Sequence, residues 1–147
     1  RMIYDWVRRK YPQTPIIIMG QSLGGSVAID LAYHRKCCGL IIEGAFSCVK
    51  DVADLTLGDF SWIYYLGAYR FDNLSKIRQI PVPKLFFHGS QDPVVPFVLG
   101  KKLYDEAKSP KKLVIFPGEN HVNLGNLYAD RYWQEVEAFV KRNMPGM

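Results

Sequence analysis

The chain has 147 residues, of which 48% are hydrophobic and 22% charged, and its formal net charge is +5. This length and composition predict a single globular domain over residues 1–147 and exclude a repeat or low-complexity protein. No apolar run is long enough to span a bilayer, and neither a secretory signal nor a membrane attachment is visible in the chain. We therefore expect a cytoplasmic protein.

The basic residues and the cysteines indicate no special ligand. Short basic clusters at residues 8–10, 35–36 and 141–142 fall at the ends of predicted elements, which is typical of a solvated surface. No basic stripe carries interleaved aromatic residues, so nucleic acid is not an expected partner. Cys37, Cys38 and Cys48 lack metal-ligand spacing and form no disulfide framework, which favours a reducing compartment and no metal site.

Helix and strand patterns alternate along the chain. Residues 2–11 predict a helix with Ile3, Trp6 and Val7 on one face, ended by Pro12. Residues 15–19 form an apolar run without polar alternation, as in a strand buried on both faces. A second helix follows the next glycines, and further strands are predicted at residues 39–42, 83–87 and 112–116. This order predicts an α/β fold with a parallel sheet.

The last two predicted helices have apolar faces that should pack on the sheet. In the helix over residues 97–108, the expected inward residues are Val98, Leu99, Leu103, Tyr104 and Ala107. In the helix over residues 128–143, they are Trp133, Val136 and Val140.

Residues 47–80 show no strand pattern and predict a cap or insertion over a site, or a helical excursion. The segment is rich in aromatic residues: Phe60, Trp62, Tyr64, Tyr65, Tyr69 and Phe71. These side chains would either line an acyl pocket or pack on the sheet.

A glycine-rich turn lies between the first predicted strand and the second predicted helix, and its pattern can be compared with known functional motifs. Gly20 and Gly25 have P-loop spacing, but Ser26 stands where the phosphate-binding lysine should be, and Ser22 replaces the middle glycine of a dinucleotide motif. The remaining pattern, Gly20-Gln21-Ser22-Leu23-Gly24, is typical of a nucleophile elbow. Small flanking residues let the turn close, and the helix N-terminus favours an anion beside Ser22. A packing turn with an incidental serine is the plainer alternative.

A nucleophilic serine needs a base, and the base needs an orienting acid. Asp92 follows the third predicted strand and His121 the fourth, so both lie at the sheet edge that carries Ser22. Glu43, at the end of the second strand, is an alternative acid, or else a carboxylate bonded to nearby backbone N–H groups. His88 is interpreted as a structural, hydrogen-bonded histidine.

The sequences GQSLGG, HGSQDPVVP and PGENH together resemble the α/β-hydrolase superfamily. The resemblance implies Ser22 as nucleophile, Asp92 as acid, His121 as base and no cofactor. The segment IIEGAFSCVKDVA looks like the branch of intracellular serine hydrolases that includes acyl-protein and lysophospholipid hydrolases.

The resemblance also implies that the four strands correspond to strands five to eight of that fold, so that the chain is the carboxyl-terminal part of a longer enzyme. The Leu23 N–H would supply one oxyanion donor, while the second would come from a loop that this chain lacks; losing one donor typically costs about 10²–10³ in rate. The first strand would then be an exposed apolar edge that can pair with another copy.

We therefore expect a serine hydrolase that cleaves a small-molecule or acyl ester, thioester or amide through an acyl-enzyme. A non-catalytic binding or scaffold module is one alternative. An acyltransferase or lyase that uses the same three residues is another. The sequence does not define the substrate or the oligomeric state.

Overall fold

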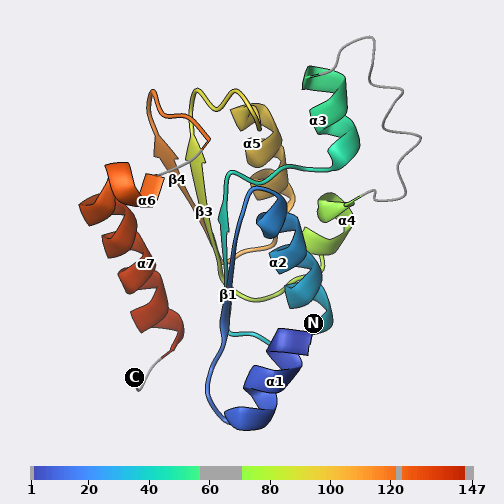
Figure 1. Cartoon of the computed structure of the whole chain (residues 1–147), viewed down its shortest axis with the longest axis vertical. Helices are drawn as coiled ribbons and strands as arrows, with labels where there is room; N and C mark the ends of the chain where they lie inside the picture. The colour runs from blue at the N-terminus through green and yellow to red at the C-terminus, as the bar shows by residue number, and fades with distance from the viewer. Residues whose placement is uncertain (1, 57–70, 122–123, 145–147) are drawn as a thin grey trace.

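Four parallel strands form the centre of the molecule, hydrogen-bonded in the order β1-β2-β3-β4 (Figure 1). The computed structural model describes residues 2–56, 71–121 and 124–144. The strands are β1 (Ile17–Gln21), β2 (Gly39–Glu43), β3 (Lys84–Gly89) and β4 (Lys111–Phe116). All three pairings are parallel, which confirms the predicted α/β fold.

Helices connect the strands and cover both faces of the sheet. Their bounds are α1 (Met2–Lys10), α2 (Leu23–His34), α3 (Val49–Thr56), α4 (Asn73–Ile77), α5 (Phe97–Glu106), α6 (Leu124–Leu127) and α7 (Ala129–Asn143). Figure 1 shows α7 on one side of the sheet and α2 and α5 on the other. This three-layer arrangement follows from the strand–helix alternation of the sequence.

The core has one part on each face of the sheet, because successive residues of a strand point to opposite faces. On one face, Leu40 and Ile42 of β2 pack with α2, α4 and α5. On the other face, Ile41 packs with strands β3 and β4 and with α6 and α7. β2 and β3 are buried along their whole length, as expected for central parallel strands.

β1 differs from the expectation that it is buried on both faces. Ile18 is buried, but Met19 is 47% exposed. The reason is that, within the described residues, β1 pairs with β2 alone and forms the edge of the sheet. The exposed apolar edge that the resemblance implied is therefore present in this structure.

Two predicted helix faces are partly wrong. In α5, Leu99, Leu103 and the following Ala107 are buried as expected, whereas Val98 is 58% exposed. In α7 the buried residues are Tyr132 and Phe139, and the expected Trp133 is 52% exposed. The buried stripe of α7 is thus rotated by about one residue from the predicted one.

The predicted cap lies only partly within the described residues. Helices α3 and α4 belong to its flanks, while Phe60, Trp62, Tyr64, Tyr65 and Tyr69 fall outside the described ranges. The cap and the single-domain organisation stay predictions. None of the described helices is long and apolar enough to cross a membrane, and the cytoplasmic location also stays a prediction.

Candidate active site

Ser22 occupies a sharp turn between the last residue of β1 and the first residue of α2. Its backbone has φ 51° and ψ −123°, a left-handed conformation that costs a non-glycine residue on the order of 1–3 kcal/mol. Two hydrogen bonds hold this conformation: the Ser22 N–H donates to the Glu43 carbonyl at 2.8 Å, and the Gly25 N–H donates to the Ser22 carbonyl at 2.9 Å. The strained turn lifts the Ser22 side chain above the end of the sheet.

Two glycines near Ser22 are required by close packing. A Cβ at Gly20 would lie 2.2 Å from the Gly24 carbonyl oxygen and 2.7 Å from the Ala28 Cβ. A Cβ at Gly25 would lie 2.7 Å from the Ala45 Cβ, a constraint that the sequence did not reveal. At Gly24, by contrast, a Cβ would meet no described atom within 4 Å. Close packing therefore explains the glycine at position 20, as expected, but not the one at position 24. It also requires Gly25, which was not expected.

The Ser22 hydroxyl is the first member of a chain of three side chains. Ser22 Oγ lies 2.8 Å from His121 Nε2, and His121 Nδ1 lies 2.6 Å from Asp92 Oδ2. The three residues come from the ends of β1, β3 and β4, whose carboxyl ends meet at one edge of the sheet. In this arrangement His121 can accept the Ser22 proton, and Asp92 can stabilise the charged ring that results.

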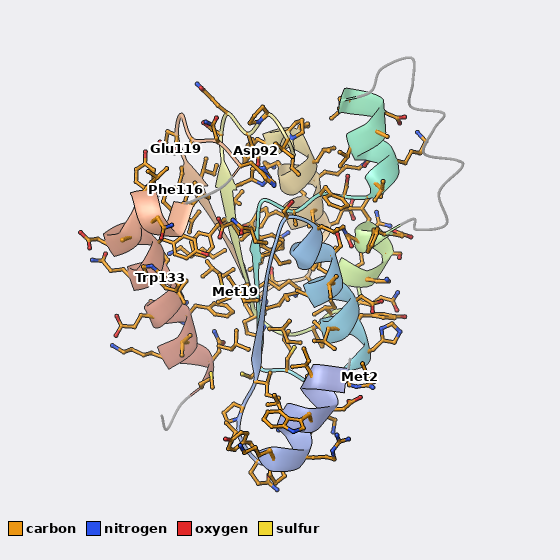
Figure 2. All side chains as sticks on the ribbon, viewed as in Figure 1. Met2, Met19, Asp92, Phe116, Glu119 and Trp133 are labelled. Carbon is orange, nitrogen blue, oxygen red and sulfur yellow. The ribbon has the colours of Figure 1, made fainter. Side chains whose placement is uncertain are left out.

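Asp92 is fixed by the loop that carries it. Its second oxygen, Oδ1, accepts hydrogen bonds from the Val94 N–H at 2.9 Å and from the Val95 N–H at 2.8 Å. Asp92 and His121 are both buried, while Ser22 is partly exposed. Figure 2 shows Asp92 at the upper end of the sheet, near the tops of β3 and α5. The acid is therefore shielded from water, while Ser22, at the other end of the chain of contacts, is partly accessible.

The backbone N–H of Leu23 is the group that we predicted from the sequence as an oxyanion donor. Leu23 is the first residue of α2, so its N–H belongs to the first helical turn, which has no acceptor within the helix. Its side chain is 53% exposed. The N–H therefore offers a donor beside Ser22 at the positive end of the helix dipole.

Glu43 does not contact His121 in this structure. Its carboxylate accepts hydrogen bonds from Gln21 Nε2 at 3.0 Å and from the Tyr132 hydroxyl at 2.7 Å, so its partners are side chains rather than the expected backbone N–H groups. Burial and the Glu43 carboxylate hold the pKa of Tyr132 above its ordinary value. No local pattern predicted the contact with Tyr132, which lies 89 positions from Glu43.

Gly44, the residue after Glu43, lies close to the His121 ring. Gly44 has φ 53°, and a Cβ built there would lie 3.3 Å from both Nδ1 and Cε1 of His121. The glycine thus allows the end of β2 to approach the His121 ring. The sequence could have indicated this close approach, because Gly44 directly follows a buried strand.

The other reactive side chains take structural positions. His88 is buried and hydrogen-bonded to a backbone carbonyl, as interpreted from the sequence. Cys37, Cys38 and Cys48 are free thiols, and burial raises the pKa of each, which disfavours the reactive thiolate. Among the described residues, no group of three or more histidine, cysteine or acidic side chains could hold a metal.

Similarity to known proteins extends over most of this chain. No family model matches it. The lysophosphatidylserine lipase ABHD12 of Danio rerio is 34% identical to it, over 76% of this chain and 34% of the relative. The ABHD12 of Xenopus tropicalis is 30% identical, over 76% of this chain and 33% of the relative. The chain thus spans about a third of the length of these relatives.

Solved structures share its fold. An esterase of Pyrococcus furiosus superposes with a TM-score of 0.77 at 20% identity, covering 96% of this chain and 59% of the esterase. An α/β hydrolase from a sediment metagenome superposes with a TM-score of 0.72 at 18% identity, covering 97% of this chain and 68% of that hydrolase. At these identities the likeness supports the fold.

Proposed function

Because this chain belongs to the α/β-hydrolase superfamily, we propose that it hydrolyses carboxylic esters with Ser22 as nucleophile, His121 as base and Asp92 as acid. The single observation that carries the proposal is the continuous contact from Ser22 Oγ through the His121 ring to Asp92 Oδ2. Three residues that lie far apart in the sequence make these two contacts, and the serine among them holds a strained backbone conformation. Such strain is concentrated at functional sites.

The proposed reaction proceeds through an acyl-enzyme. Ser22 Oγ attacks the ester carbonyl while His121 Nε2 takes the hydroxyl proton. Asp92 stabilises the imidazolium through Nδ1–H, and the Leu23 N–H donates to the oxyanion of the tetrahedral intermediate. His121 then protonates the leaving alcohol, activates a water molecule and returns the proton to Ser22 as the acid leaves. Each of these groups belongs to this chain, so we propose no metal or organic cofactor.

For the substrate class we propose acyl esters of lipid type, such as lysophospholipids. The support is the name of the relatives, which are lysophosphatidylserine lipases. Thioesters and amides use the same chemistry and remain within the proposal as further substrates.

The test is covalent labelling of the full-length protein with a fluorophosphonate, followed by intact mass. We expect one adduct on the wild type and none on Ser22→Ala. Hydrolysis of lysophospholipids and simple esters is then measured with and without an added alcohol acceptor, because an acyltransferase would transfer the acyl group to the alcohol. A folded wild-type protein that forms no adduct would contradict the proposal and favour the scaffold alternative.

The assignment of the acid has its own matched pair of variants. Asp92→Asn should lower the rate of labelling by a factor on the order of 10⁴, because His121 would lose the acceptor that holds its tautomer. Glu43→Gln should cost far less, since Glu43 contacts Gln21 and Tyr132 instead of His121. A larger loss for Glu43→Gln than for Asp92→Asn would reverse the assignment.

A further inference from the structure

His88 is the second-last residue of β3, four positions before Asp92, and only 2% of its surface is exposed. Its Nε2 atom is 2.9 Å from the Val95 carbonyl oxygen. A carbonyl oxygen only accepts, so Nε2 carries a proton and donates it to Val95. Burial lowers the pKa of His88, which favours the neutral ring.

Val95 is also one of the two residues whose N–H groups hold Asp92. Its N–H donates to Asp92 Oδ1 at 2.8 Å, while its carbonyl accepts from His88. The other carboxylate oxygen, Oδ2, contacts His121 at 2.6 Å and lies 3.5 Å from His88 Nε2. A hydrogen-bonded path therefore runs from His88 through Val95 and Asp92 to His121.

The surroundings of the His88 ring leave it little freedom. A Cβ at Gly100 of α5 would lie 2.2 Å from His88 Nδ1, so the helix approaches the ring closely only because residue 100 has no side chain. Phe97 contacts the ring edge-on, with 5.6 Å between ring centroids. The titratable groups that act on His88 are Asp92, which favours its protonation, and His121, which opposes it.

We propose that His88 is a positioning residue for Asp92: its Nε2–H fixes the Val95 peptide, and that peptide fixes the carboxylate that orients His121. The inference rests on the proposed function, because it assigns His88 a part in the same reaction. His88 would touch neither the substrate nor the reacting atoms.

Two substitutions at position 88 separate the hydrogen bond from the bulk of the ring. The amide nitrogen of glutamine reaches the place of Nε2, whereas that of asparagine stops near the place of Nδ1. We expect His88→Gln to keep most of the fluorophosphonate labelling rate of the full-length protein. His88→Asn should lower that rate by a factor on the order of 100, the loss typical of a misplaced catalytic group.

Gly100 supplies an independent test through the same ring. Gly100→Ala should push the His88 ring from its place and slow labelling. In a His88→Ala background, the ring is absent, so adding Gly100→Ala should cause little further loss. Fully additive losses from the two substitutions would overturn the inference, because they would mean that Gly100 acts independently of His88.

A spectroscopic readout distinguishes positioning from a purely structural role. The short His121–Asp92 hydrogen bond should give a low-field proton resonance, identified by its loss in Asp92→Asn. We expect this resonance in the wild type and in His88→Gln, and a weakened one in His88→Asn. If His88→Asn lowers the melting temperature but leaves the resonance and the labelling rate unchanged, the inference is wrong while the proposed function stands. A folded wild type without any Ser22 adduct would remove the proposed function and this inference with it.

Discussion

At residue 20 the candidate elbow leaves no room for a side chain. The contacts that an added Cβ would make are with the Gly24 backbone and with Ala28 of α2, and a backbone cannot move aside without opening the turn. We predict that Gly20→Ala destabilises the protein by about 1–3 kcal/mol, the range typical of overpacked core sites, and abolishes Ser22 labelling. Thermal unfolding and fluorophosphonate labelling of the soluble fraction would measure the two effects.

Gly24 is the matched control for that substitution. It lies in the first turn of α2, and no described atom would come within 4 Å of its added Cβ. Since alanine favours a helix over glycine by up to about 1 kcal/mol, Gly24→Ala should leave stability unchanged or slightly increased. Equal losses for Gly20→Ala and Gly24→Ala would refute the steric explanation.

Lys84 is a buried cation at the start of β3. Its Nζ donates to the Val82 carbonyl at 2.7 Å and to the Lys108 carbonyl at 3.0 Å, and the residue is 1% exposed. Burial, followed by the charge of Lys111, lowers the pKa of Lys84 from 10.5 to about 8. The folded protein therefore releases this proton at a lower pH than the unfolded chain.

This difference predicts how stability depends on pH. Below pH 8 Lys84 is protonated in both states, and folding bears the cost of burying the charge. Between pH 8 and 10.5 the unfolded chain binds more protons, so the free energy of unfolding should rise with pH, by at most about 3 kcal/mol. Lys84→Met lacks this titration, so urea unfolding should show the wild type gaining stability relative to Lys84→Met over that range. A constant difference between the two proteins would contradict the prediction.

At the scale of elements, one hydrogen bond ties α7 to the end of β2. The Tyr132 hydroxyl donates to the buried Glu43 carboxylate, and its ring stacks on Phe87 with 4.3 Å between centroids. Tyr132→Phe would keep the stacking but leave a buried carboxylate with one donor fewer. We predict a loss of about 1–3 kcal/mol in the free energy of unfolding, measured with urea.

Tyr128→Phe is the control for Tyr132→Phe. The Tyr128 hydroxyl also donates to a carboxylate, that of Glu119, but both side chains are only partly buried. Water can replace the Tyr128 hydroxyl as a donor to Glu119, so the loss in the free energy of unfolding should stay below about 1 kcal/mol. A greater loss at position 128 than at position 132 would show that burial of Glu43 is not the cause.

The same helix shows where prediction from the sequence stops. The alternation of strands and helices, the strand bounds within a few residues and the helical nature of α7 followed from periodicity. Its buried face did not, because two overlapping stripes fit the pattern, one through Trp133 and one through Tyr132 and Phe139. The carboxylate of Glu43 and the ring of Phe87 favour the second stripe, and both partners lie on other elements.

For the candidate site, the sequence predicted the three central residues but not the residues that hold them in place. Ser22, Asp92 and His121 each follow a parallel strand, so their meeting at one edge follows from topology, and the structure brings their side chains into contact. Their catalytic roles stay predictions. The supports from His88 and Gly25 depend on distances between packed elements, which no local pattern contains.

At the scale of the whole molecule, the edge of the sheet formed by β1 carries an exposed apolar side chain. Met19 of β1 is 47% exposed, although central parallel strands are usually buried. Figure 2 shows Met19 on the edge strand between α7 and α2. An exposed strand offers unpaired N–H and C=O groups together with apolar side chains, which favours pairing with another strand.

We therefore predict that residues 1–147, produced alone, self-associate through β1. Met19→Lys places a charge on the edge strand and should shift the population toward monomer in sedimentation velocity at several concentrations. Val98→Lys introduces the same charge on α5, at a residue that is 58% exposed, and should leave the association unchanged. If the unmodified chain stays monomeric at every concentration, the edge is protected by the rest of the fold. If both lysine variants dissociate it equally, general charge repulsion, rather than strand pairing at β1, controls the assembly.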